Sequence, residues 1–388
     1  FHGKLNRDLR GLYAASYMHE GEKKHLAVTQ FEEIEARRAF PCFDHPKFNT
    51  PFVIELVIGE GQAAIATTRV EEETTLEDGR KLVRFRRTPP MPTYLLFFGT
   101  GNFEFLEGTE CHVPIRVAAT PGKAAYGAKS IEFARKSIEF CEAFTGVDYP
   151  VDKLDLIAVP EFAYGGMENL GAITYRENLL LYYPDVVSRV GLQNIAAINA
   201  HEVAHMWFGD LTSPRDWQFV WLNEAFATYV GNLILDSAYP DWHAMDQFLL
   251  SAGHAAMGRD SLKGTIPIEF PDAGLTEIDS STAPIIYSKA GLVLRMVHQW
   301  VGEEVFTSGV RSYLSAFEYD STDTDGFLTE FGKGAGLEAA SVINNWIRQP
   351  GFPVVEASRA GNTLTLRQQR FVYGDPEATA GAEPGQTW

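Results

Sequence analysis

The residues best suited to chemistry are two histidines with a glutamate between them, in the run His201-Glu-Val-Ala-His205. On an α-helix, residues four apart lie about 6 Å along the axis and about 40° around it, so both imidazoles can bind one small cation. Glu202 then projects from the neighbouring face. Two nitrogen ligands for zinc, with a carboxylate to handle the proton of a water molecule, form the HExxH pattern. The motif alone is suggestive rather than conclusive.

The residues around this motif favour metal ligands over ordinary core histidines. The run from 195 to 208 is apolar almost all round, which predicts a helix buried on most sides. Burying two histidines and a glutamate without partners is unfavourable by several kcal/mol. Core histidines would need separate partners for each group, whereas one metal ion and its water serve all three.

A third ligand is predicted at Glu224, in the run Trp221-Leu-Asn-Glu224. On the helix that follows, Glu224 lies roughly opposite Phe226 and beside small residues. A lone glutamate there is normally a solvated surface residue. After an HExxH helix, however, it is the expected third ligand. Three protein ligands leave one tetrahedral position open, which is typical of a catalytic zinc, so we expect one Zn²⁺ per chain.

A glycine-rich turn adds a further candidate, formed by Gly165, Gly166, Met167, Glu168 and Asn169. The two glycines let the backbone approach a ligand closely. Glu168 offers a fixed negative charge that could hold a substrate ammonium group. Taken alone, such a turn would be an ordinary loop.

The elements that must position these residues change in kind along the chain. Residues 1 to about 116 read as β-rich, with strand-like runs at 51–58, 81–86 and 93–98. Helical periodicity begins after Pro121-Gly122, with a helix predicted over 123–144. Two short strands are expected at Leu154–Val159 and Ala172–Tyr175, and helices dominate from there to about residue 347.

Both ends of the sequence look cut. The chain starts at Phe1, and Thr363–Val372 alternates like a half-buried strand. One such strand cannot bury its own face. We therefore expect a fragment, whose last residues begin a domain that continues elsewhere.

Composition narrows the classes of partner. The 388 residues are 45% apolar and 22% charged, as in ordinary globular proteins, and no window is apolar enough to predict a membrane span. The net charge of -18, without a block of Lys and Arg, makes nucleic acid and anionic membranes poor partners. Three scattered cysteines (Cys42, Cys111 and Cys141) suit neither a disulfide framework nor a thiolate metal site, and mildly favour a cytoplasmic protein.

Taken together, the motifs resemble those of the zinc aminopeptidases of the gluzincin class, the alanyl and puromycin-sensitive type, over essentially the whole chain. The matching segments are Thr29-Gln30, Ala36–Asp44, the GxMEN loop at 165–169, HExxH at 201–205, Trp221–Glu224 and Ile286–Lys289. The resemblance implies an α+β multidomain fold. It comprises a β-rich N-terminal domain at 1–116 (incomplete at its start), a thermolysin-like zinc catalytic domain at 117–352 and the start of a β-sandwich at 353–388.

The resemblance also implies roles for individual residues. The reaction would be hydrolysis of the N-terminal peptide bond of peptides that carry a free N-terminus. Glu202 would act as general base and then acid, and Tyr287 would donate a hydrogen bond to the oxyanion. Glu168 with Gln30 would hold the substrate ammonium.

Some positions differ from the residues usually found in the motifs of this family. Gly166 stands in place of the usual alanine, and Met206 and Asp210 stand where glutamine and asparagine are common. Gly166 also occurs in the leukotriene-epoxide hydrolase branch. A zinc hydrolase acting on a lipid epoxide is therefore one alternative, and a non-catalytic peptide-binding fragment is another.

Overall fold

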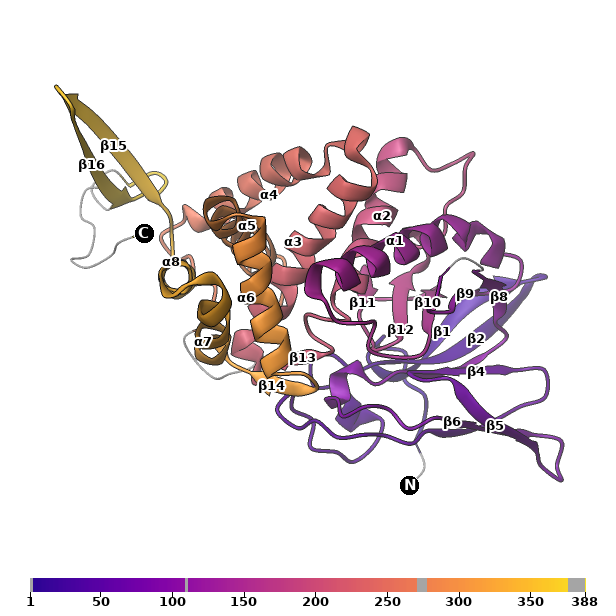
Figure 1. The fold of residues 1–388 in the computed structure, drawn as a ribbon. Helices are drawn as coiled ribbons and strands as arrows, with labels where there is room; N and C mark the ends of the chain where they lie inside the picture. The colour runs from indigo at the N-terminus through magenta and orange to yellow at the C-terminus, as the bar shows by residue number, and fades with distance from the viewer. Residues whose placement is uncertain (1–2, 109–110, 271–277, 376–387) are drawn as a thin grey trace.

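The computed structural model describes residues 3–108, 111–270, 278–375 and 388. A β-rich N-terminal part packs against a larger body made mostly of helices, and a two-stranded hairpin projects from the far end of that body (Figure 1). The predicted α+β multidomain architecture is confirmed.

The N-terminal part contains a four-stranded and a three-stranded sheet. Their orders are β1 (Gly11–His19), β2 (Glu22–Gln30), β7 (Phe98–Gly101), β4 (Ala63–Ala66), and β3 (Glu55–Ile58), β6 (Lys81–Phe85), β5 (Val70–Thr75). In β1, Tyr13, Ala15 and Tyr17 are buried while the residues between them are partly exposed. This alternation places one face of the strand on the core.

A five-stranded sheet lies next to these two, in the order β11 (Gly166–Met167), β12 (Ala172–Arg176), β10 (Leu154–Val159), β9 (Ile115–Ala119), β8 (Glu104–Glu107). β10 runs parallel to β9 and β12, and β8 and β11 are the antiparallel edges. Every residue of β10 is buried. The two strands predicted at 154–159 and 172–175 are therefore confirmed. The predicted boundary after residue 116 falls within β9, and the domain boundaries stay predictions.

The helical body is built from eight α-helices among the described residues. They are α1 (Ala128–Thr145), α2 (Arg189–Ala204), α3 (Trp221–Ala238), α4 (Ala244–Asp260), α5 (Ala290–Val301), α6 (Glu303–Ala316), α7 (Thr324–Ala335) and α8 (Leu337–Arg348). A π-helical turn, Pro284–Lys289, leads directly into α5. The short strands β13 (Thr212–Pro214) and β14 (Asp320–Thr322) pair in parallel and tie the start of α3 to the start of α7.

The strand predicted at 93–98 is wrong for most of its length. Thr93–Leu95 forms a 3₁₀ turn, and β7 begins only at Phe98. Residues 93–97 are all buried, so the run has no alternation that could separate a strand from another buried segment.

The hairpin pairs β15 (Pro353–Ala360) with β16 (Thr363–Arg370). Most side chains of both strands are exposed. The strand predicted at Thr363–Val372 is thus confirmed as far as Arg370, but the half-buried face expected for it is wrong, because residues 363–368 are all exposed. Within the described part of the chain, none of the helices combines the length and apolar character needed to span a membrane.

Candidate active site

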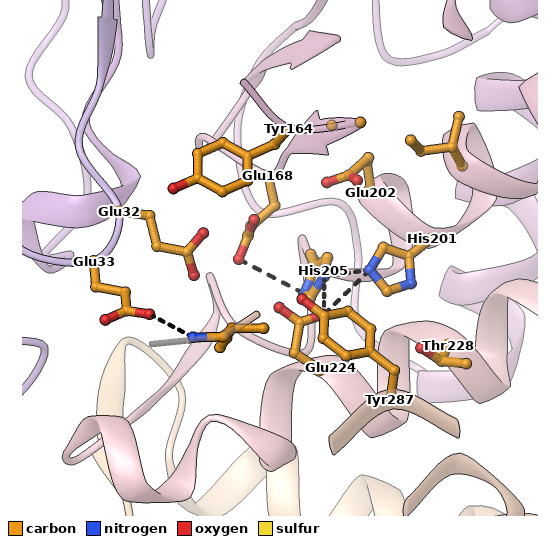
Figure 2. A pocket seen from close by; sticks show the side chains of 14 residues that line it. Glu32, Glu33, Tyr164, Glu168, His201, Glu202, His205, Glu224, Thr228 and Tyr287 are labelled. Atoms are coloured by element: carbon orange, nitrogen blue, oxygen red, sulfur yellow. Dashed lines mark hydrogen bonds and ion pairs between the residues drawn. The ribbon is translucent and has the colours of Figure 1, made fainter. Parts of the chain in front are cut away.

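The three predicted metal ligands meet at the contact between α2 and α3. Ser188 caps α2 by accepting a hydrogen bond from the Gly191 backbone N–H. The helix ends one residue before His205, whose backbone N–H still bonds to the His201 carbonyl. The two Nε2 atoms lie 3.0 Å apart, and Glu224 Oε2 lies 3.2 Å from His201 Nε2 and 3.4 Å from His205 Nε2 (Figure 2).

A glycine allows α3 to approach α2 this closely. A Cβ on Gly231 would lie 3.2 Å from the backbone nitrogen of His201. Glu224 sits in the first turn of α3 and is only 3% exposed. The small residues beside Glu224 therefore allow the two helices to pack closely. As a result Glu224 is buried, whereas a helix glutamate is usually exposed to solvent.

His205 is oriented by the backbone that follows it. Its Nδ1 lies 2.9 Å from the carbonyl oxygen of Phe208. Because a carbonyl can only accept, Nδ1 carries the proton in this contact and Nε2 keeps its lone pair. That lone pair faces His201 and Glu224, as a metal ligand requires.

The donor set fits a zinc ion. Two imidazole nitrogens and one carboxylate oxygen converge within 4.8 Å of one another. Burial by itself would raise the pKa of Glu224, but His205 and His201 more than offset that effect and hold it at about 2. Glu224 is therefore a carboxylate. Two nitrogens and an anionic oxygen at one point are the ligands zinc prefers.

Further carboxyl groups give the site an excess of acidic side chains. Burial raises the pKa of Glu202 and of Glu32 well above the usual range, and Glu168 and Glu224 add to both shifts. The pKa of Glu168 is also raised, again mainly by burial. Glu32, Glu168 and Glu224 can bring one oxygen each within 4.8 Å of one another. Buried like charges at this separation favour binding of cations.

Glu202 lies against the glycine-rich loop. A Cβ on Gly166 would lie 2.2 Å from Glu202 Oε1, so the glycine leaves the room that this carboxylate occupies. Tyr287 reaches the site from the π-helical turn, and its ring stacks against His201 with 5.9 Å between centroids. Burial raises the pKa of Tyr287 well above 10, and the charge of Glu224 adds to this. Tyr287 therefore keeps its proton and can donate it in a hydrogen bond.

Most of the predicted site residues line one cavity of about 460 Å³. From the sequence-based set, the lining includes Gly165, Gly166, Glu168, His201, Glu202, His205, Glu224 and Tyr287. Met167 and Asn169 belong to the same loop but are buried and do not line the cavity, and Asn169 Nδ2 bonds to Thr174 Oγ1 at 3.1 Å. Gln30 is fully buried at the end of β2 and does not line the cavity, so its predicted contact with substrate stays a prediction.

Sequence reasoning missed other residues that line the cavity: Glu32, Glu33, Tyr164, Ile198, Thr228 and Ile278. Figure 2 shows Glu32 facing Glu168 across the cavity. One oxygen of Glu32 is buried and has no hydrogen-bond partner among the described residues. The only signal in the sequence was its position two residues after Gln30. In the structure β2 ends at Gln30, and Glu32 lies in the turn that follows.

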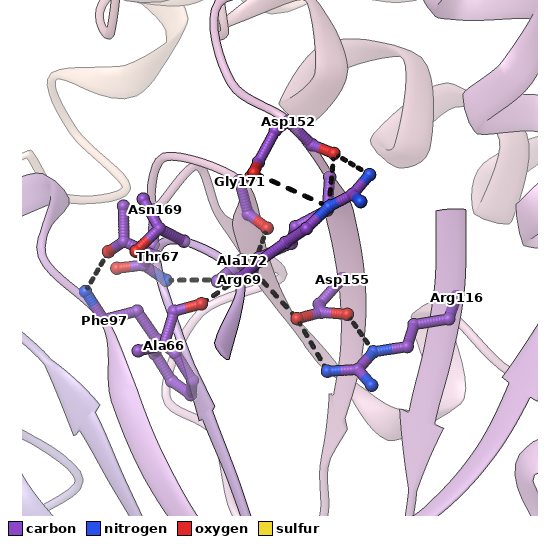
Figure 3. A network of polar contacts seen from close by, with 12 residues as sticks. Ala66, Thr67, Arg69, Phe97, Arg116, Asp152, Asp155, Asn169, Gly171 and Ala172 are labelled. Carbon is purple, nitrogen blue, oxygen red and sulfur yellow. Dashed lines mark hydrogen bonds and ion pairs between the residues drawn. The ribbon is translucent and has the colours of Figure 1, made fainter. Parts of the chain in front are cut away.

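A second polar network holds the loop region against the N-terminal part (Figure 3). Lys153 is buried, and its Nζ donates to the Ala66 and Gly171 carbonyls, each at 2.6 Å, and to Asp155 Oδ2 at 2.9 Å. Arg116 binds the same carboxylate with two nitrogens. Gly171 follows the glycine-rich loop by two residues, so Lys153 connects that loop to β4.

Comparisons with known proteins place the chain in a family. A family model described as "Peptidase family M1 domain" matches residues 129–346, and one described as "Peptidase M1 N-terminal domain" matches residues 1–95. The chain is 37% identical to mitochondrial aminopeptidase 2 of Saccharomyces cerevisiae, with 100% of the chain and 40% of the relative covered. It is 38% identical to a leucyl aminopeptidase of Saccharolobus solfataricus, with 96% and 47% covered. The chain thus spans less than half the length of these relatives.

Proposed function

The chain belongs to peptidase family M1, and on that premise we propose that it takes part in zinc-dependent removal of the N-terminal residue from peptides. The observation that carries the proposal is that a metal-ligand set and two further carboxylates lie in one cavity. A His-His-Glu ligand set stands beside two further carboxylates, Glu168 and Glu32. The ligand set suits a hydrolytic metal, and the extra carboxylates suit a substrate ammonium.

His201, His205 and Glu224 would hold one Zn²⁺ ion. When bound, the ion supplies Lewis acidity, which polarises a peptide carbonyl and makes water easier to deprotonate. Glu202 accepts the proton of the attacking water on its carboxylate and delivers it to the leaving amine. Burial raises the pKa of Glu202 above its usual range, which favours uptake of a proton from water by this carboxylate.

Tyr287 stabilises the transition state through its hydroxyl. The hydroxyl keeps its proton because burial raises its pKa, and it donates to the oxygen on which negative charge develops. Removing one such donor lowers kcat by about 10²–10³-fold in hydrolases.

Glu168 and Glu32 select the end of the peptide. Their carboxylates accept hydrogen bonds from the free α-ammonium, so that only the first peptide bond reaches Glu202 and Tyr287. The short edge strand β11 (Gly166–Met167) lies beside this position and offers backbone groups to an extended substrate. The substrates would then be peptides with a free N-terminus. The cytoplasm stays the predicted compartment, and it rests on the scattered cysteines alone.

The test is an assay with aminoacyl-arylamides on metal-stripped and zinc-loaded protein. Activity should require zinc, and Glu202→Gln should abolish it. Glu168→Gln should lower kcat/KM about tenfold or more for unblocked substrates, because it removes a hydrogen bond to a charged group. The same variant should change the residual rate on N-acetylated substrates much less. Full activity of Glu202→Gln, or of the stripped protein, would refute the proposal, and turnover of a lipid epoxide without peptide turnover would favour the alternative hydrolase.

A further inference from the structure

A tyrosine of the N-terminal part reaches into the contact between α2 and α3. Tyr94 lies in the 3₁₀ turn Thr93–Leu95 and is 1% exposed. Its hydroxyl donates to the Gly209 carbonyl at 2.9 Å and accepts from Asn223 Nδ2 at 3.1 Å. Its ring packs edge-on against Trp217, with 5.1 Å between centroids. One side chain thus joins two segments that are separate in the helical body.

Each of these segments carries a predicted metal ligand. Asn223 directly precedes Glu224 in the first turn of α3. Gly209 follows His205 by four residues, and a Cβ on Gly209 would lie 3.3 Å from His205 Nδ1. The nitrogen of Gly209 and the carbonyl of Phe208 belong to one peptide plane, and that carbonyl accepts the bond from His205 Nδ1. The position of Gly209 therefore fixes the ring orientation of His205.

The Tyr94 turn is itself held by a conspicuous sequence motif of the N-terminal part, Ala36–Asp44. Asp44 is 4% exposed and accepts a bond from Thr93 Oγ1 at 2.7 Å. Arg37 donates its backbone N–H to Asp44 Oδ2 at 2.9 Å and its guanidinium to the Asp44 carbonyl at 2.8 Å. Hydrogen bonds thus lead from Arg37 through Asp44 to Thr93, which directly precedes Tyr94 in the chain.

We propose that Tyr94 is a positioning residue for the metal site, and that through it the N-terminal part sets the separation of His205 and Glu224. The inference rests on the proposed function only in taking zinc as the ion. Partners that orient metal ligands change metal affinity by about 10–100-fold when they are removed. The Tyr94 hydroxyl contacts the segments that carry two of the ligands, so a loss of zinc affinity in this range is expected.

The experiment measures zinc affinity without any assay of activity. Metal-stripped wild type, Tyr94→Phe and Tyr229→Phe compete with a chromogenic chelator for zinc. Tyr94→Phe keeps the ring against Trp217 and removes only the hydroxyl. Tyr229→Phe is the matched control, because it removes a buried hydroxyl from α3 whose partner is His298 Nδ1 at 2.7 Å. We expect Tyr94→Phe to bind zinc at least about tenfold more weakly than wild type and Tyr229→Phe to bind it like wild type. The absorption bands of bound Co²⁺ should shift in Tyr94→Phe alone.

The outcomes separate this inference from the proposed function. If wild type binds zinc and Tyr94→Phe binds it equally well, the positioning role is wrong and the proposed function stands. An equal loss in both variants would also overturn the role, since it would reflect general loosening of the helices. If wild type takes up no zinc, both proposals fail. Should Tyr94→Phe not fold, Thr93→Val removes the bond to Asp44 instead, and an unchanged zinc affinity in that variant refutes the inference.

Discussion

Lys153 offers the sharpest test of how the two parts of the protein are held together. Its ammonium is buried and donates three hydrogen bonds, to the carbonyls of Ala66 and Gly171 and to Asp155. Lys153→Met keeps the length of the side chain and removes the charge. Two carbonyls then lose a donor in the interior, and Asp155 keeps only Arg116.

The expected loss follows from these contacts. Removing one partner of a buried ion pair is destabilising by about 3–5 kcal/mol. Arg116 still neutralises Asp155, which places the expected value near the lower end, at about 3 kcal/mol. An exposed pair gives a scale for comparison, because such pairs contribute about 0–1 kcal/mol. Lys81, which binds Glu73 at 2.7 Å and is 41% exposed, is a suitable example.

The assay is urea unfolding followed by tryptophan fluorescence and far-ultraviolet circular dichroism. Wild type, Lys153→Met and Lys81→Met are compared at neutral pH. We expect the free energy of unfolding to fall by about 3 kcal/mol in Lys153→Met and by less than about 1 kcal/mol in Lys81→Met. Equal, small losses in both variants would show that the buried ammonium contributes no more than a surface lysine, and would refute the reasoning.

Two further predictions concern acid stability and the π-helical turn. Burial by itself would raise the pKa of Asp155, but Lys153 and Arg116 more than offset it and hold the pKa below its usual range. The stability from this depressed pKa is fully present above about pH 4 and is lost as pH falls through the folded-state pKa. The urea midpoint should therefore drop in acid, and Asp155→Asn should show a smaller drop; equal acid slopes would contradict this. Lys289 binds the carbonyls of residues 349 and 351 and anchors the turn that carries Tyr287. Lys289→Met should lower kcat on an aminoacyl-arylamide about tenfold with little change in KM, because Tyr287 is the proposed transition-state donor, and an unchanged kcat would exclude this anchoring role.

The residues that sequence alone could place are those whose neighbours along the chain decide their position. His201 and His205 are one helical turn apart, so local periodicity was enough to predict that they meet. Glu224 was predicted from its place after the HExxH helix, because periodicity alone would have made it a surface residue. The strands at 154–159 and 172–175 could also be predicted from the sequence, because each is a short apolar run between turns.

The residues that sequence missed depend on contacts far along the chain. Glu32 enters the cavity only because the end of β2 packs beside the helical body, and nothing local distinguishes it from other glutamates. The run containing Tyr94 was read as a strand because it is uniformly apolar, whereas its 3₁₀ turn is set by burial on every side and by the bond from Thr93 to Asp44. Packing between distant segments decided both cases.

The β15–β16 hairpin leaves its strand edges open for further pairing. Neither strand pairs with a third strand among the described residues, so both outer edges carry rows of open N–H and C=O groups. Apolar side chains stand on both faces, since Val354 and Val355 are consecutive and both exposed. Each open edge is therefore a place where a further strand can pair, which is how the β-sandwich predicted from the sequence would extend the hairpin.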